Sequence, residues 1–189
     1  MAAMNQMRLY FAYGSNINPE YMRLKCSDPR VLGIARLNGY RMDFFGYSTT
    51  WDGAVETVVE DASADIWGVL YQLDEFDWNR LDNCEDVRAD GTGEYFHYPV
   101  EVIDGQGKLT AAILYRKARQ GTPEIPSREY LGLIVKGAEE QKLPAAYVAR
   151  LKTLAAKPAS YAVPRRPSYN RVGAAGGASG CGDCSECSG

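Results

Sequence analysis

An aromatic strand pattern that breaks at Gly14-Ser15-Asn16 and passes at once into a helix start constrains this chain more than any other feature. Tyr10–Tyr13 is apolar and aromatic, as in a buried strand. Asn18 and Pro19 are a typical helix cap and first helical residue. Such a turn exposes several main-chain N–H groups at one point, which can hold an anion or a developing oxyanion. Gly, Ser and Asn are also ordinary turn formers, so the pattern alone leaves both interpretations open.

Length and charge exclude several classes of protein. The 189 residues are enough for one domain with a real core and a short appendage. A net charge of −3 with both signs interspersed gives no support for nucleic acid or an anionic membrane as a partner. No stretch approaches the roughly 18 apolar residues of a membrane span, and the first residues lack the apolar core of a secretion signal. We therefore expect a cytoplasmic protein, with Met1, Met4 and Met7 as alternative starts.

Predicted strands outnumber predicted helices along the body of the chain. The strands are expected at residues 8–14, 31–37, 40–45, 54–59, 65–73, 95–103 and 109–116. Asn38-Gly39 is expected to be the tight turn of a hairpin. Helices are expected at residues 19–26 and 74–85, and as a final pair that starts at Ser127 and Pro144. These elements predict an α+β fold whose sheet is curled or barrel-like, because the strands are short and interrupted by glycines.

Composition divides the chain into three parts. We expect a domain at residues 7–156, a Pro/Arg-rich linker at 157–172 and a flexible Gly-rich tail at 173–189. The tail carries three cysteines with C-x₂-C-x₂-C spacing, which are Cys181, Cys184 and Cys187. They are incidental or redox-active thiols, ligands of a soft metal that takes its fourth ligand from elsewhere, or a site of attachment or processing.

Within the body, the residues able to do chemistry each have a plain structural interpretation too. His97 is the single histidine, which excludes a mechanism or metal site that needs two from one chain. It could serve Cys84 as a base, although nothing in their spacing requires contact. The acidic run 82–86 is either solvated surface or, beside the apolar Cys84 and Val87, a partly desolvated carboxyl that moves protons near neutral pH. Tyr130 is either a core residue or a hydroxyl directed into a pocket.

Four motifs, in order from Arg8 to Leu154, resemble the gamma-glutamylcyclotransferase-like (AIG2-like) family. The first is Tyr10-Phe11-Ala12-Tyr13-Gly14-Ser15-Asn16 with the helix that ends at Cys26-Ser27-Asp28-Pro29. The others are Trp67-Gly68-Val69-Leu70-Tyr71, then Leu81-Asp82-Asn83-Cys84-Glu85-Asp86-Val87, and the segments Pro126-Ser127-Arg128-Glu129-Tyr130 and Leu143-Pro144-Ala145-Ala146-Tyr147. Several motifs in register are more specific than any one of them.

The resemblance implies a small mixed β-barrel with flanking helices and a pocket for a small-molecule γ-glutamyl substrate. In the implied reaction the substrate's α-amine attacks its own γ-carbonyl, which releases 5-oxoproline and an amine or amino acid without a cofactor. This is acyl transfer with lyase-type release. Glu85 is the implied general acid/base, and main-chain N–H groups of the turn are the implied oxyanion donors. The implied substrate-binding residues are Tyr10, Phe11, Ala12, Tyr13, Gly14, Ser15, Asn16 and Tyr130.

The resemblance leaves the substrate and some local features open. Glutathione fragments, γ-glutamyl amino acids, γ-glutamyl-lysine-type amines and a biosynthetic γ-glutamyl intermediate all fit, and the oligomeric state is not indicated. The loop at residues 46–53 is expected to border the pocket. Asp86 would raise the pKa of Glu85 if its carboxyl lay close and have no effect if it pointed outward. The rival functions are a non-catalytic module that binds a γ-glutamyl or carboxylate ligand, and a carrier domain for the cysteine tail.

Overall fold

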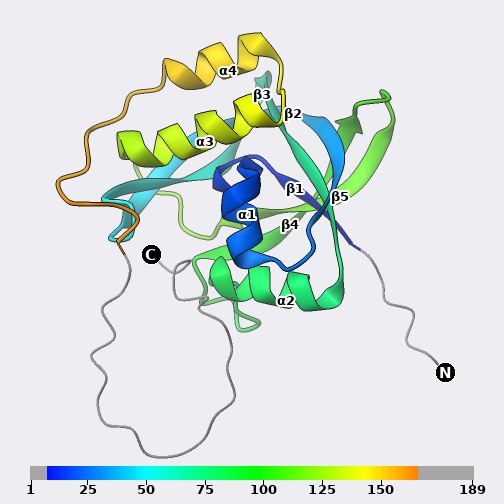
Figure 1. The fold of residues 1–189 in the computed structure, drawn as a ribbon, viewed down its shortest axis with the longest axis horizontal. Helices are drawn as coiled ribbons and strands as arrows, with labels where there is room; N and C mark the ends of the chain where they lie inside the picture. Colours follow the sequence, from blue (N-terminus) through cyan, green and yellow to red (C-terminus); the bar gives the residue numbers. More distant parts are fainter. Residues whose placement is uncertain (1–7, 166–189) are drawn as a thin grey trace, which may run out of the picture.

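The computed structural model describes residues 8–165, whose strands form a closed barrel flanked by helices (Figure 1). The strands are β1 (Arg8–Ala12), β2 (Arg30–Ser48), β3 (Gly53–Leu73), β4 (Tyr95–Asp104) and β5 (Leu109–Lys117). The helices are α1 (Pro19–Lys25), α2 (Glu75–Cys84), α3 (Arg128–Glu140) and α4 (Ala145–Lys152), with a 3₁₀ turn, η1, at Ser15–Ile17. The expected α+β class with a small mixed β-barrel and flanking helices is confirmed.

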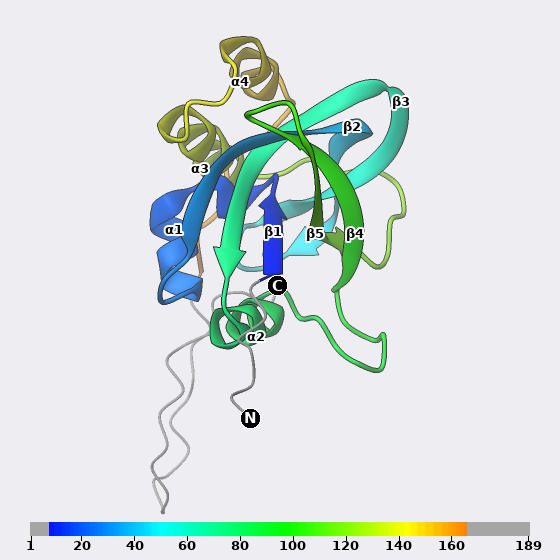
Figure 2. The same cartoon turned by 90° about the vertical axis from the view of Figure 1, so that its right-hand side faces the viewer.

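The barrel is mixed because one of its strand pairs is parallel. The strand order is β1-β3-β2-β4-β5, and the ring closes where β1 meets β5 in parallel at Tyr10 and Ile113. The other neighbouring strands run antiparallel. Figure 2 shows β2 and β3 curving around the barrel as long ribbons. The short β1 therefore lies between strands on both sides, and the turn that follows it is held at one end of the barrel.

The predicted hairpin at Asn38-Gly39 is wrong. Residues 30–48 form one continuous strand, which pairs along its length with another continuous strand, β3. Asn38 opposes Asp65 and Tyr40 opposes Glu60, so the register shifts at Gly39, where φ is +79°. A glycine in the left-handed region serves a bulge as well as a tight turn. The bulge takes up residues 61–64, which lie within the segment 60–64 that the sequence suggested as a break between two strands.

The helix starts follow the capping rules. The side chain of Asn18 accepts from the N–H of Tyr21 and Pro19 opens α1, while Ser127 caps α3 in the same way. α3 and α4 lie side by side on one side of the barrel, and α1 lies between α3 and α2 (Figure 1). A Cβ at Gly137 would stand 2.5 Å from the N of Asn18, so only glycine lets α3 approach the turn this closely. The helices thus fix the segment that joins β1 to α1.

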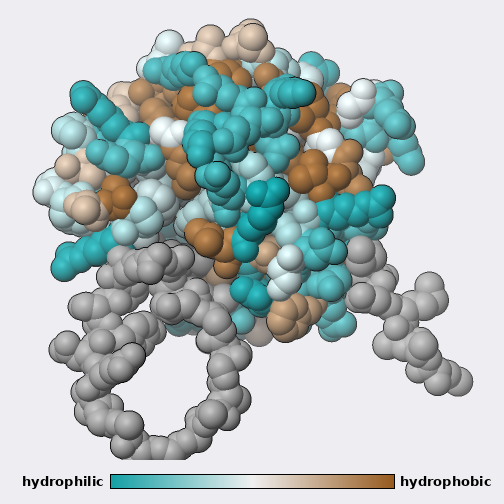
Figure 3. All heavy atoms as spheres, viewed as in Figure 1, coloured by the Kyte–Doolittle hydropathy of each residue, from teal (hydrophilic) through white to brown (hydrophobic). Residues whose placement is uncertain are grey.

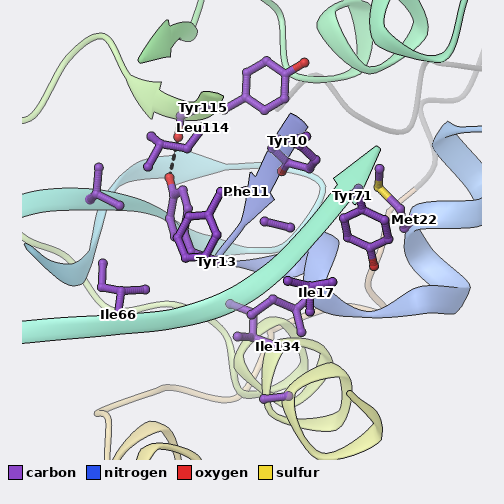
Figure 4. Packing of buried hydrophobic residues seen from close by; sticks show 14 of the residues in the cluster. Tyr10, Phe11, Tyr13, Ile17, Met22, Ile66, Tyr71, Leu114, Tyr115 and Ile134 are labelled. Atoms are coloured by element: carbon purple, nitrogen blue, oxygen red, sulfur yellow. Dashed lines mark hydrogen bonds between the residues drawn. The ribbon is translucent and has the colours of Figure 1, made fainter. Parts of the chain in front are cut away.

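The core fills the barrel and the space under α3 (Figure 4). Its fully buried side chains include Phe11, Ile17, Ile66, Tyr71, Leu114 and Ile134. Each such side chain contributes about 1.5–3 kcal/mol through burial. A Cβ at Gly68 would lie 2.2 Å from the carbonyl oxygen of Ala12, so the backbones of β1 and β3 approach closely at this glycine. The strand that leads into the Gly14 turn is therefore firmly packed.

Part of the Pro/Arg-rich segment lies against the domain. Arg128 N–H donates to the carbonyl of Lys157 at 2.7 Å, and Arg165 N–H donates to the carbonyl of Thr50 at 2.8 Å. The Ser160 hydroxyl donates to Asp52 at 2.6 Å. Residues 157–165 are thereby tied to the loop between β2 and β3. Residues 173–189, where the cysteine tail is predicted, lie outside the described residues.

The outer face is of mixed character. Figure 3 shows brown apolar patches separated by hydrophilic side chains on the face that carries α1 and α3. No helix in residues 8–165 has the length and apolarity that a membrane crossing requires.

Candidate active site

Glu85 lies beside the Gly14–Asn16 turn. It caps the C-terminus of α2, and its Oε1 accepts from Asn16 Nδ2 at 2.9 Å and from Lys25 Nζ at 2.8 Å. Lys25 comes from the last turn of α1 and also donates to Asn16 Oδ1 at 2.9 Å. The side chains of Lys25 and Glu85 are 4% and 14% exposed. The sequence suggested a carboxylate between apolar neighbours, whereas the structure shows one held by an ammonium and an amide.

A second carboxylate, Glu56, also contacts the turn. Glu56 comes from β3 and is buried. Its Oε1 accepts from the main-chain N–H of Ser15 at 2.7 Å, and its Oε2 accepts from the hydroxyl of Tyr130. None of the ion pairs formed among residues 8–165 involves Glu56. A Cβ at Gly14 would stand 1.8 Å from Glu56 Oε1, so the glycine makes room for this carboxylate.

Tyrosine hydroxyls surround the two carboxylates. Tyr10 accepts from Asn16 Nδ2 at 2.8 Å, and Tyr13 donates to the carbonyl of Tyr115 at 2.6 Å (Figure 4). Burial raises the pKa of Tyr10 well above 10.0, and the charge of Glu85 raises it further. Burial and then the charge of Glu56 act in the same direction on the pKa of Tyr13 and of Tyr130. These hydroxyls therefore stay neutral and can donate hydrogen bonds throughout the physiological pH range.

A small cavity of about 30 Å³ opens beside Glu85 and Tyr130, which is room for about one water molecule. Its lining residues are Ser15, Tyr21, Lys25, Ser48, Thr50, Trp51, Val55, Glu85, Tyr95 and Tyr130. The loop expected to border the pocket thus contributes Ser48, Thr50 and Trp51. The Trp51 ring lies 4.7 Å from that of Tyr130, centroid to centroid. Larger and more open hollows elsewhere on the described surface hold neither of these two carboxylates.

The structure brings some of the predicted site residues together and separates others. Asn16 and Glu85 are in direct contact, and Ser15 and Tyr130 meet through Glu56. Six of the predicted site residues do not line the cavity, namely Tyr10, Phe11, Ala12, Tyr13, Gly14 and Asn16. Of these, Phe11 and Ala12 are fully buried core residues of β1.

The other candidate groups of the body point elsewhere. His97 Nε2 lies 2.6 Å from Asp82 Oδ1, which also accepts from the Tyr115 hydroxyl at 2.6 Å. Asp86 accepts from Arg88 at 2.8 Å and from the N–H of Glu94 at 3.1 Å, so its carboxyl is held by the following loop. Among residues 8–165, no three His, Cys, Asp or Glu side chains gather as metal ligands.

Sequence reasoning missed Lys25 and Glu56 as members of the site, and it placed the loop at residues 46–53 beside the pocket without singling out Trp51. Lys25 and Glu85 are 60 residues apart in the chain, and Glu56 and Ser15 are 41 apart. A lysine at a helix end and a glutamate in a strand ordinarily face water, so neither position stood out. The one available signal was that Glu56 stands among the apolar residues Ala54, Val55, Val58 and Val59 of a predicted strand.

Comparison with known proteins agrees with this architecture. Residues 65–151 match the profile of the AIG2-like family. The chain is 32% identical over 151 residues to gamma-glutamylcyclotransferase of Homo sapiens, covering 77% of this chain and 78% of that protein. The gamma-glutamylcyclotransferase of Bos taurus is 31% identical over 151 residues, which again cover 77% of this chain and 78% of that protein. A solved structure of a gamma-glutamyl cyclotransferase superimposes with a TM-score of 0.78 at 29% identity, covering 84% of this chain and 94% of that one. The chain therefore belongs to the gamma-glutamylcyclotransferase-like (AIG2-like) family of enzymes.

Proposed function

We propose that this protein cyclises a γ-glutamyl compound, releasing 5-oxoproline and an amine or amino acid, with Glu85 as general acid/base and no cofactor. The observation that carries the proposal is the 2.9 Å hydrogen bond from Asn16 Nδ2 to Glu85 Oε1, which joins a carboxylate to the Gly14–Asn16 turn. A proton acceptor and main-chain donors then stand side by side, as the reaction requires. The human and bovine relatives named gamma-glutamylcyclotransferase support the same reaction.

In the proposed mechanism the nucleophile belongs to the substrate. The α-ammonium first loses one proton to solvent. The free amine nitrogen then attacks the γ-carbonyl carbon to form a tetrahedral oxyanion, and Glu85 takes the surplus proton of the attacking nitrogen. Glu85 returns the proton to the leaving nitrogen as the carbon–nitrogen bond to the leaving group breaks. Lys25 and Asn16 both hold Oε1 of Glu85, so we assign the proton transfer to Oε2. Acid–base help of this kind is typically worth about 10²- to 10⁴-fold in rate.

Shape and main-chain donors supply the rest of the proposed catalysis. The main-chain N–H groups of the turn other than that of Ser15, which donates to Glu56, would hold the oxyanion, and one such donor is worth about 3 kcal/mol. The rings of Trp51 and Tyr130 would hold the flexible glutamyl chain in the bent form that closes the ring. The physiological amine partner is left to experiment, since glutathione fragments, γ-glutamyl amino acids and γ-glutamyl-lysine-type amines all carry the reacting group.

The test is release of 5-oxoproline from a panel of these γ-glutamyl compounds. Glu85→Gln should fold normally and lower kcat by about 10²- to 10⁴-fold. Glu75→Gln, at the exposed opposite end of α2, is the matched control and should keep full activity. Full activity in Glu85→Gln would falsify the assigned base. Calorimetric binding of γ-glutamyl compounds without any product would instead favour a non-catalytic binding module.

A further inference from the structure

We propose that the Glu56 side chain competes with the ligand's carboxylate for one binding site. It accepts hydrogen bonds from the main-chain N–H of Ser15 and the hydroxyl of Tyr130, and it leaves these donors when a carboxylate ligand binds. The inference rests on the proposed function for the identity of that ligand, which is the α-carboxylate of a γ-glutamyl group or of 5-oxoproline. The occupied position itself is a feature of the structure.

The first support is the pair of donors that Glu56 uses. Ser15 N–H and the Tyr130 hydroxyl come from different elements, η1 and α3, and each meets a different oxygen of the same carboxylate. Both residues also line the cavity beside Glu85. Two donors that converge on one carboxylate at the edge of a cavity form a carboxylate site, and here a side chain of the protein fills it.

The second support is the size of the cavity. Its volume of about 30 Å³ admits about one water molecule, whereas ligand pockets usually measure about 300–1,000 Å³. A glutamyl group therefore enters only if something moves. The side chain of Glu56 turns about three single bonds, while Ser15 and Tyr130 are fixed by main chain and by a buried ring. Departure of the Glu56 carboxylate frees two donors and extends the cavity in one step.

The third support is charge. No ion pair among residues 8–165 holds Glu56, although the carboxylate is buried, so two neutral donors alone keep it in place. A buried charge without a counterion is costly, so moving the carboxylate from this site into water requires less free energy than it would for a paired one. A second carboxylate cannot share the site with the first, since like charges at contact distance repel strongly. An anionic ligand must therefore displace Glu56, whereas a neutral ligand need not.

The experiment compares two ligands that differ in charge at one group. Calorimetry measures binding of 5-oxoproline and of its neutral primary amide to the full chain, to Glu56→Gln and to Glu60→Gln. Glu60 lies on the same strand with an exposed side chain and is the matched control. We expect Glu56→Gln to bind 5-oxoproline at least about tenfold more tightly, to change amide binding by less than about threefold, and Glu60→Gln to change neither. Unchanged or weaker 5-oxoproline binding by Glu56→Gln overturns the inference.

Kinetics give a second readout that a structural role would not produce. Glu56→Gln should lower KM for a γ-glutamyl substrate and leave kcat within about twofold, because only competition for the bound state is removed. A large fall in kcat would make Glu56 part of the chemical step and overturn the proposal. If the variant does not fold, a crystal structure of the wild-type chain with 5-oxoproline decides. A structure in which Glu56 has moved away from the N–H of Ser15 supports the inference. A structure in which Glu56 still accepts from that N–H refutes the inference.

The two proposals fail separately. Tighter carboxylate binding by Glu56→Gln without turnover of any γ-glutamyl compound would keep the carboxylate site and refute the cyclotransferase activity. Turnover with 5-oxoproline affinity unaffected by Glu56→Gln would keep the activity and refute the competitor.

Discussion

Glu56 and Glu85 contact the same turn at neighbouring residues and are held in different ways. Glu85 is paired with the ammonium of Lys25, and both of its donors hold a single oxygen. The donors that Glu56 meets among residues 8–165 are neutral, and they hold both of its oxygens. A counterion keeps a carboxylate charged and in place, whereas neutral donors can be lost to any better acceptor. The contrast explains why we assign the permanent acid/base role to Glu85 and the displaceable role to Glu56.

The largest loss of stability is expected from a substitution that takes the space of the Glu56 carboxylate. In Gly14→Ala the new Cβ would stand 1.8 Å from Glu56 Oε1, and the carboxylate must give up the N–H of Ser15. Hydrogen bonds to charged groups are worth about 1.5–3 kcal/mol each, so we expect the free energy of unfolding to fall by about 3 kcal/mol. Urea denaturation followed by circular dichroism measures the change.

A double-mutant cycle identifies the cause of this loss. Glu56→Ala removes the atoms that the new Cβ meets, so Gly14→Ala should cost less than half as much in that background. Equal costs in the two backgrounds would show that the turn, and not the carboxylate, requires the glycine.

The next largest loss of stability is expected when Glu85 loses its ion-pair partner. Lys25→Met leaves Glu85 without its ammonium at a site where the lysine is buried. Breaking a fully buried pair costs about 3–5 kcal/mol, and water reaches part of Glu85, so we expect a loss of about 2 kcal/mol in unfolding free energy. Lys136→Met is the matched control, because its bond to Glu20 is exposed to solvent and should add little to stability. Similar losses in both variants would contradict a special role for the Lys25 pair.

Much of the architecture follows from local chemistry that is visible in the sequence. Asn18 and Ser127 cap helices because their short side chains accept from main-chain N–H groups three residues on. The turn at Gly14 is recognisable because aromatic strand residues stop there and a helix start follows. Asn38-Gly39 was misjudged because a left-handed glycine suits a bulge and a hairpin equally, and only the partner strand decides between them.

The site could be predicted only where a motif contained it. Glu85 and the turn belong to motifs that resemble a family, so their residues were assigned without knowledge of the packing. Glu56 and Lys25 enter the site through contacts 41 and 60 residues apart in the chain. Such contacts depend on how β3 curves and on where α1 ends, and no local pattern encodes either. Periodicity places a residue on a face of a strand but does not say what that face meets.

The smallest effect tests whether neutral donors alone hold Glu56. Tyr130→Phe removes one of them, and we expect a loss of about 1.5 kcal/mol in unfolding free energy, the lower end for hydrogen bonds to charged groups. Tyr40→Phe removes a hydroxyl that meets that of Tyr98 at 3.0 Å in a partly buried position, and it should cost about 0.5 kcal/mol or less.

The pH dependence of the Tyr130→Phe stability loss tests whether the hydroxyl of Tyr130 stays neutral. Burial and Glu56 raise the pKa of Tyr130 in the folded state well above 10.0. The stabilisation linked to a raised pKa is fully present below the unfolded value and is lost only as the pH rises past about 10. The difference between wild type and Tyr130→Phe should therefore be constant from about pH 6 to 9 in urea denaturation. A difference that disappears within that range would mean that the hydroxyl loses its proton there, and that Glu56 is not held by a neutral donor.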